Sequence, residues 1–191
     1  MYELPTSVEI GGVEYKIRNN GDYRVILDIF SILEDPTLTK AERILSAVIV
    51  FYEDFSDIED LTQLPNMEEA IKKMYEFFNA GRKDSSGPNK KLIDWEDDSA
   101  MIVSAINNVA KKEIRAEEYI HWWTFVSYYM SIGESTLSTV VSIREKMMSG
   151  KSLEKWETKF KTQNPQYFSW NSKTVEEQEA TNWVLEQWGA V

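Results

Sequence analysis

The first apolar residues of the chain alternate with polar ones at a period of two, on both sides of a glycine pair. Val8 and Ile10 precede Gly11 and Gly12, and apolar side chains return at every second position afterwards. This alternation indicates strands, and glycine tolerates the positive φ angles of a two-residue hairpin turn. The pattern predicts a β-hairpin over residues 7–18. Because two strands alone are marginally stable in water, the hairpin should pack on another element or another chain.

From about Asp22 onward, apolar residues recur three or four positions apart, which is typical of helices. Helix-starting residues precede several of these stretches: Thr39 and Thr174 begin capping-box patterns, and Asn66 and Asp94 are candidate N-caps. The pattern predicts about eight helices, over residues 22–35, 39–52, 66–80, 94–109, 116–132, 135–148, 152–163 and 174–188.

A length of 191 residues is typical of one domain, or two at most. We therefore expect a mainly α fold, with a single helical domain over residues 1–191 and the hairpin at its N-terminus. Residues 81–91 (GRKDSSGPNKK) contain two glycines, a proline and no large apolar side chain, which predicts a flexible loop.

The amino-acid composition excludes several kinds of catalytic and metal site. The chain has no cysteine, so thiolate nucleophiles, Cys-based zinc sites and iron–sulfur clusters are excluded. His121 is the single histidine, which excludes paired-histidine metal sites. The formal net charge of −11 disfavours nucleic-acid binding. The longest apolar runs are too short to cross a bilayer, and the N-terminus lacks the pattern of a signal peptide. We expect a cytosolic protein without a cofactor, whose partners are other proteins.

Four carboxylates at Asp94, Glu96, Asp97 and Asp98 are the strongest candidate for a metal site, because Mg²⁺ prefers carboxylates and water. The competing interpretation is structural: Asp94 caps a helix and the other three match the dipole of its first turn. We favour the structural role, since neighbouring residues on a helix point in different directions.

His121-Trp122-Trp123 is the most distinctive tripeptide. No nucleophile or orienting acid accompanies it in a recognisable motif, so we expect the His121 ring to donate to a carboxylate or carbonyl on a neighbouring helix. Core spacing predicts burial of four tryptophans, namely Trp95, Trp122, Trp123 and Trp156. Three others near the C-terminus are candidates for an exposed binding face, namely Trp170, Trp183 and Trp188.

Charge is unevenly distributed along the chain. Residues 53–69 contain seven acids and no base, whereas residues 144–161 contain six bases and three acids. Lys151, Lys155 and Lys159 recur every four positions, which predicts a basic stripe on one helix. Each segment alone is typical of a solvated face, but together they suggest complementary patches for head-to-tail self-association.

An ordered set of motifs resembles the bacteriophage "gene product fifteen" family, encoded among the tail genes of phages and prophages of Gram-positive bacteria. The likeness extends to about Asn164 and is carried by Leu4-Pro5, Asp22-Tyr23-Arg24, Ile93-Asp94-Trp95-Glu96-Asp97-Asp98, Glu113-Ile114-Arg115, His121-Trp122-Trp123-Thr124-Phe125, Ser142-Ile143-Arg144-Glu145-Lys146 and Gly150-Lys151-Ser152-Leu153-Glu154-Lys155.

The resemblance implies a non-enzymatic tail assembly chaperone. Such a protein would bind the tape-measure protein and tail subunits in the cytoplasm of the infected bacterium and would be absent from the mature virion. From the oppositely charged segments we expect it to form a homo-oligomer as well. It implies no catalytic residue. Two alternatives stay open: a minor structural component retained in the virion, and a divalent-metal enzyme that uses the Asp94–Asp98 carboxylates.

Overall fold

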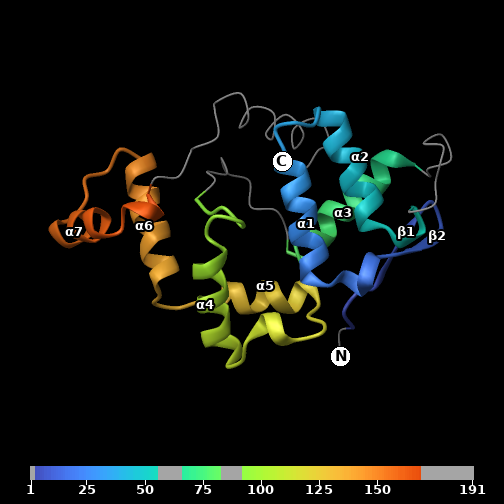
Figure 1. The fold of residues 1–191 in the computed structure, drawn as a ribbon. Coiled ribbons are helices and arrows are strands. Elements are labelled where there is room, and N and C mark those ends of the chain that lie inside the picture. Colours follow the sequence, from blue (N-terminus) through green and yellow to red (C-terminus); the bar gives the residue numbers. More distant parts are fainter. Residues whose placement is uncertain (1–2, 56–65, 83–91, 169–191) are drawn as a thin grey trace. The chain divides into compact units, whose positions relative to one another are not determined.

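The computed structural model describes residues 3–55, 66–82 and 92–168 (Figure 1). These residues form two compact units. The N-terminal unit comprises residues 3–55, 66–82 and 118–126, and the C-terminal unit comprises residues 92–117 and 127–168. Two compact units can belong to one domain or to two, so the single domain expected over residues 1–191 stays a prediction.

The N-terminal unit begins with the predicted hairpin, which is confirmed. Strand β1 (Ser7–Ile10) pairs antiparallel with β2 (Val13–Lys16), and Ile10 lies opposite Val13. Both turn glycines have positive φ, 57° at Gly11 and 82° at Gly12, as a tight hairpin with right-handed twist requires. The Gly11 N–H donates to Glu69 Oε2 at 3.0 Å, so the hairpin is anchored on the protein.

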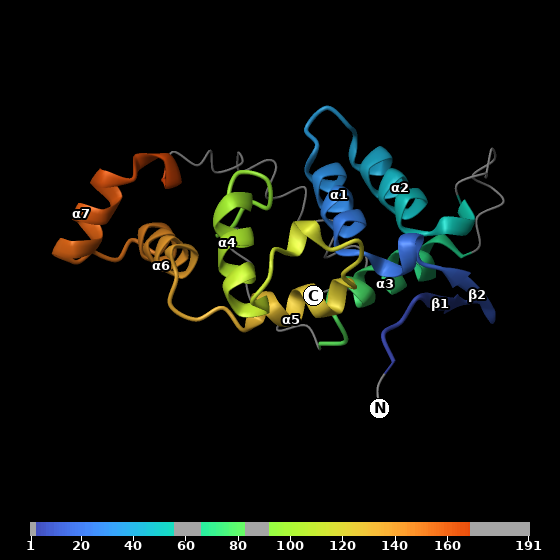
Figure 2. The ribbon, with the colours of Figure 1, turned by 60° about the horizontal axis from the view of Figure 1, so that its bottom comes forward.

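Three helices complete most of this unit: α1 (Tyr23–Glu34), α2 (Lys40–Phe51) and α3 (Met67–Phe78). Helices α1 and α2 lie side by side (Figure 2). The predicted caps are confirmed at two helices, since Thr39 forms a capping box with Glu42 and Asn66 accepts from the Glu69 N–H. Each cap satisfies backbone donors that the first helical turn leaves without partners.

Aromatic side chains fill the core of the N-terminal unit. Phe51, Tyr52 and Phe55 are almost completely buried, and Phe77 and Phe78 reach them from α3. The Tyr52 hydroxyl donates to the Ala70 carbonyl at 2.8 Å, and burial raises the pKa of that hydroxyl. Burial of each such ring contributes roughly 1.5–3 kcal/mol, so this cluster is a main source of stability.

The C-terminal unit contains α4 (Ser99–Ala110), α6 (Thr136–Met148) and α7 (Lys155–Gln163). Helix α6 packs against α4 (Figure 1, Figure 2). Helix α5 (Trp122–Met130) contributes its first part to the N-terminal unit and its last part to the C-terminal unit. The described residues therefore contain seven α-helices, which confirms the mainly α prediction. The predicted terminal helix over 174–188 lies outside them, as do residues 83–91 of the predicted loop.

Three predicted helix starts are wrong. Helix α4 begins at Ser99 rather than Asp94, because the Asp94 side chain closes a turn that precedes the helix. Helix α5 begins at Trp122 rather than at 116, because residues 114–116 form a separate short 3₁₀ turn. Helix α7 begins at Lys155 rather than at 152, because Glu154 and Glu157 form the capping box that starts it.

Within residues 3–55, 66–82 and 92–168, none of the helices combines the length and the apolar composition needed to span a bilayer.

Candidate functional site

The His121 side chain ties α5 to the N-terminal segment of the chain. Its Nδ1 atom accepts from the Trp123 N–H at 3.0 Å, and its Nε2 atom lies 3.0 Å from the Pro5 carbonyl oxygen. A carbonyl can only accept, so Nε2 carries the proton and the ring is neutral. The acceptor lies in the N-terminal segment, whereas the sequence pattern predicted a neighbouring helix. Both contacts are with backbone groups, which is a structural arrangement.

Asp22 makes a second connection to the segment around His121, through the neighbouring Ile120. Its carboxylate accepts from the Arg24 N–H as the N-cap of α1, accepts from the Ile120 N–H at 3.0 Å, and pairs with the Arg24 guanidinium at 3.0 Å. Trp122 and Trp123 donate their indole N–H groups to the last carbonyls of α3, at Phe78 and Phe77. Trp122 is buried and Trp123 is half-buried. These tryptophans therefore hold α5 against α3.

The neutral state of His121 predicts a pH dependence of stability. Burial lowers the pKa of His121, with the hydrogen bond to the Pro5 carbonyl opposing it. The pKa of His121 in the folded state lies below the ordinary value of about 6.5. The neutral ring therefore makes its full contribution to the free energy of unfolding above that pH, and this contribution is lost as the pH falls below it. Urea unfolding of the wild-type chain and of His121→Gln should show a stability difference that shrinks between about pH 7.5 and pH 5.5. Parallel pH profiles of the two proteins would contradict this prediction.

The Asp94–Asp98 carboxylates do not act as a group. Asp94 Oδ1 accepts from the Glu96 and Asp97 N–H groups at 3.0 Å each, which shapes the turn before α4. Asp98 is buried, and Asp97 is exposed. Trp95 is half-buried rather than buried, and its ring contacts Tyr129. Among the described residues, no three acidic or histidine side chains lie where they could share a metal ion.

Asp98 pairs instead with Arg144 of α6, a connection that sequence reasoning missed. Arg144 Nη1 and Nη2 donate to the two Asp98 carboxylate oxygens at 2.5 and 2.9 Å. The same guanidinium donates to the Leu92 carbonyl once and to the Tyr167 carbonyl twice. All five N–H donors of Arg144 are thus used. This buried ion pair joins α4, α6 and the segments that precede α4 and follow α7.

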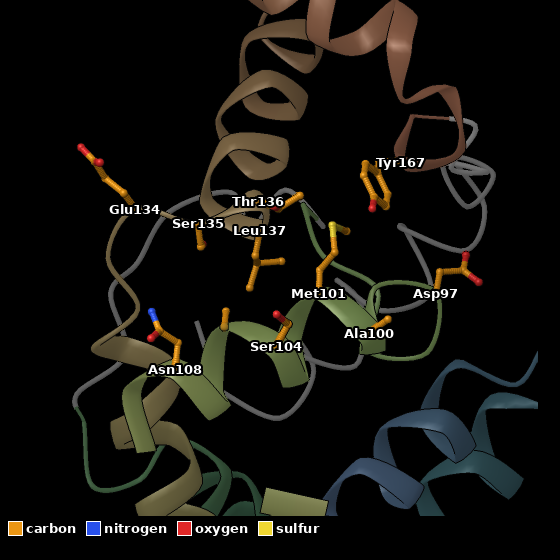
Figure 3. A pocket seen from close by; sticks show the side chains of 11 residues that line it. Asp97, Ala100, Met101, Ser104, Asn108, Glu134, Ser135, Thr136, Leu137 and Tyr167 are labelled. Atoms are coloured by element: carbon orange, nitrogen blue, oxygen red, sulfur yellow. The ribbon is translucent and has the colours of Figure 1, made fainter. Parts of the chain in front are cut away.

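A groove of about 500 Å³ lies between α4 and α6, and we call it the α4–α6 groove (Figure 3). Its floor is apolar, because Met101 and Leu137 point into it from the two helices (Figure 3). Its lining residues are Asp97, Ala100, Met101, Ser104, Ala105, Asn108, Glu134, Ser135, Thr136, Leu137 and Tyr167. The groove follows one face of α4.

Small and acidic side chains border the α4–α6 groove. Ala100, Ser104 and Asn108 lie four residues apart on α4 and are exposed. Asp97 lies at one end of the groove and Glu134 at the other, and both are exposed (Figure 3). None of the described residues that line it is a lysine or an arginine. A segment with apolar and basic side chains would match this groove in chemistry.

The predicted basic stripe is only partly present. Lys155 and Lys159 lie on α7 and are exposed. Lys151 precedes α7, because its N–H bonds the Lys146 carbonyl and closes the C-terminus of α6. Trp156 is 53% exposed, so the predicted burial is wrong. The buried face of α7 presents Glu157, which pairs with Lys146 at 2.6 Å, whereas the neighbouring Trp156 donates its indole N–H to the exposed Glu154 side chain.

A second, smaller pocket of about 290 Å³ lies in the N-terminal unit, and we call it the Trp123 pocket. Its lining residues come from β1 and the segment before it, from α3 and the turn after it, and from α5, namely Pro5, Val8, Glu9, Lys73, Glu76, Phe77, Gly81 and Trp123. Most of its walls are apolar. The predicted binding residues Trp170, Trp183 and Trp188 lie outside the described part of the chain.

The described residues form a mainly helical protein whose motif residues hold the structure together and whose surface carries the α4–α6 groove and the Trp123 pocket. The chain belongs to the bacteriophage Gp15 protein family, whose model matches residues 1–167. It is therefore a phage protein. No curated protein and no solved structure matches it.

Proposed function

We propose that this phage protein is a tail assembly chaperone that binds helices of the tape-measure protein, and tail subunits, without catalysing a reaction. It would act in the cytoplasm of the infected bacterium and leave before the virion is complete. Membership of a bacteriophage family supports a role in the phage life cycle. The observation that carries the proposal is the α4–α6 groove, because its form suits a helical segment.

The dimensions of the α4–α6 groove support a helical partner. The exposed positions Ala100, Ser104 and Asn108 extend over about 12 Å of α4, which is slightly more than two helical turns. Small side chains along this ridge allow a second helix axis to approach closely. The apolar floor at Met101 and Leu137 offers contacts for side chains that recur at helical spacing on the partner.

The charges at the ends of the α4–α6 groove favour a partner helix with basic residues. Asp97 and Glu134 are exposed, and the structure shows no ion pair at either within the described residues. A basic residue near each end of a bound helix would meet one of these carboxylates. Such rim charges contribute mainly to specificity and to the rate of association. A net charge of −11 would keep the complex soluble while apolar helix faces are covered.

Co-expression with the tape-measure protein of the same phage tests the proposal. The wild-type chain should raise the soluble fraction of the tape-measure protein and should co-purify with it. Ser104→Trp should abolish both effects, because an indole at this exposed position fills the groove without disturbing the core. The matched control is Ser142→Trp, at an exposed position of α6 outside the groove.

Two results would contradict the proposal. If the tape-measure protein precipitated equally with and without this chain in matched lysates, the chaperone role would be wrong. If the Ser104→Trp and Ser142→Trp proteins raised its soluble fraction equally, the α4–α6 groove would not be the binding site. Mass spectrometry of purified virions tests the release step, since abundant copies in mature particles would indicate a retained structural component.

A further inference from the structure

We propose that copies of this chain associate head to tail, with Trp156 of one copy inserted into the Trp123 pocket of the next. This interaction is separate from tape-measure binding, because it uses neither α4 nor the α4–α6 groove. It rests on an exposed aromatic anchor, a preformed apolar pocket and opposite charges around the two.

The donor surface is the outer face of α7. Trp156 is 53% exposed, and its indole N–H donates to Glu154 Oε2 at 2.8 Å, which fixes the ring in place. Lys155 and Lys159 lie beside it on α7, one helical turn apart from each other, and both are exposed. Among the described residues, neither lysine has an ion-pair partner. An exposed, ordered tryptophan beside two available cations is typical of the anchor residue of a protein interface.

The acceptor surface is the Trp123 pocket. Pro5, Val8, Phe77 and Trp123 supply its apolar walls. Its volume of about 290 Å³ is at the lower limit of small-molecule sites, which span roughly 300–1,000 Å³, and so it suits one large side chain better than a metabolite. Phe77 and Trp123 are held by their own contacts, with ring centroids 6.0 Å apart, so the pocket exists before any partner arrives. Preformed pockets bind with a smaller ordering penalty.

Charge complementarity favours a second copy as the occupant. Glu9 and Glu76 are exposed at the rim of the Trp123 pocket. Glu76 pairs with Lys73 at 3.3 Å, whereas Glu9 has no ion-pair partner among the described residues. Lys155 and Lys159, which lie next to Trp156 on α7, would therefore meet carboxylates when the indole enters the pocket. Opposite charges of this kind orient an interface and exclude other partners.

The two surfaces belong to different units of the same chain, so every copy carries one donor and one acceptor. An interface between unlike surfaces is heterologous, and it extends into chains of copies unless its rotation closes a ring. Such an assembly could cover a long partner with many weak contacts.

Sedimentation velocity of the purified full chain tests the proposal. The average mass should rise with protein concentration and fall as salt screens the lysine–glutamate contacts. Trp156→Ala should weaken association about thirty-fold or more, as expected for removal of a central aromatic anchor. The control Met130→Ala removes another large apolar side chain, 61% exposed and outside α7, and should assemble like the wild type.

The pocket is tested in the same way. Val8→Lys places a charge among the apolar walls, and Glu9→Lys reverses the rim charge at an exposed position where folding is not at risk. Both should weaken self-association. Val13→Lys on the same hairpin, at a position 53% exposed and outside the pocket, should not.

Mixing the two kinds of variant distinguishes head-to-tail association from other modes. Trp156→Ala keeps an intact pocket and Val8→Lys keeps an intact Trp156, so an equal mixture should form dimers and nothing larger. A wild-type chain that is monomeric at every concentration, or a mixture that stays monomeric, would overturn the proposal. If Trp156→Ala by itself self-associated as strongly as the wild-type chain, the proposal would also be overturned. Because Ser104→Trp should self-associate normally, failure here is distinguishable from failure of the chaperone role.

Discussion

Replacing Arg144 by methionine is expected to lower the free energy of unfolding by about 3–5 kcal/mol. The substitution removes the one charged partner that the buried Asp98 carboxylate has among the described residues, and it leaves the Leu92 and Tyr167 carbonyls without these donors. Desolvating an unpaired carboxylate is the main penalty. A domain of this size has a total stability of about 5–15 kcal/mol, so the effect is a large fraction of it. Urea unfolding followed by circular dichroism measures the change.

Arg115→Met is the matched control for this prediction. Arg115 belongs to the same C-terminal unit and pairs with Glu113 at 2.8 Å, but its side chain is 65% exposed. An exposed pair of this kind contributes little, so this variant should remain close to the wild type. Adding Asp98→Asn to Arg144→Met should restore part of the lost stability, because it removes the unpaired charge. Equal stability of the two arginine variants would show that the buried pair is not a main anchor.

The contact between Asp98 and Arg144 gives a structural reason for two of the family motifs that carry no recognisable catalytic or metal-binding pattern. Asp98 closes one motif and Arg144 lies in another, 46 residues further along the chain. Likewise Pro5 and His121 come from separate motifs and meet in the N-terminal unit. These residues join distant segments. Their order identified the family, but a single sequence carries no signal for which pairs meet in space.

Local structure was predicted where the signal is local. The Gly11–Gly12 turn and the Thr39 capping box depend on residues within a few positions, and both are confirmed. The start of α4 was wrong because Asp94 and Asp98 are both candidate N-caps by type. Only the distant Arg144 determines that the Asp98 side chain is withdrawn from solvent, while Asp94 shapes the preceding turn.

The two pockets could not be predicted from the sequence. Ala100, Ser104 and Asn108 are small or polar, so their spacing gives no apolar signal for a groove. Trp156 was assigned to the core because it lies three and four positions from apolar residues, as a buried residue would. The Lys146–Glu157 pair decides which face of α7 packs inward, and that pair depends on how α6 and α7 meet. Exposure of an aromatic side chain is a tertiary property.

Gly21→Ala is expected to destabilise the N-terminal unit by about 2–5 kcal/mol. Gly21 has a φ of +77° and is buried at the end of a short 3₁₀ turn (Arg18–Gly21). A residue with a Cβ atom in the left-handed region loses about 1–2 kcal/mol, and overpacking a core adds about 1–3 kcal/mol. The overpacking arises because the new Cβ would lie 2.7 Å from Phe77 Cζ and 3.2 Å from His121 Nε2. Urea unfolding followed by tryptophan fluorescence measures the loss.

Gly150→Ala separates the two contributions. Gly150 has a similar φ of +66°, but among the described residues no heavy atom other than those of its chain neighbours lies within 4 Å of the position its Cβ would take. This variant should therefore show only the backbone part of the penalty, about 1–2 kcal/mol. The difference between the two alanine variants then measures how firmly Phe77 and His121 are held. Equal losses would mean that the Phe77 ring moves aside at little cost, and the Trp123 pocket, which the same ring lines, would then be adaptable rather than preformed.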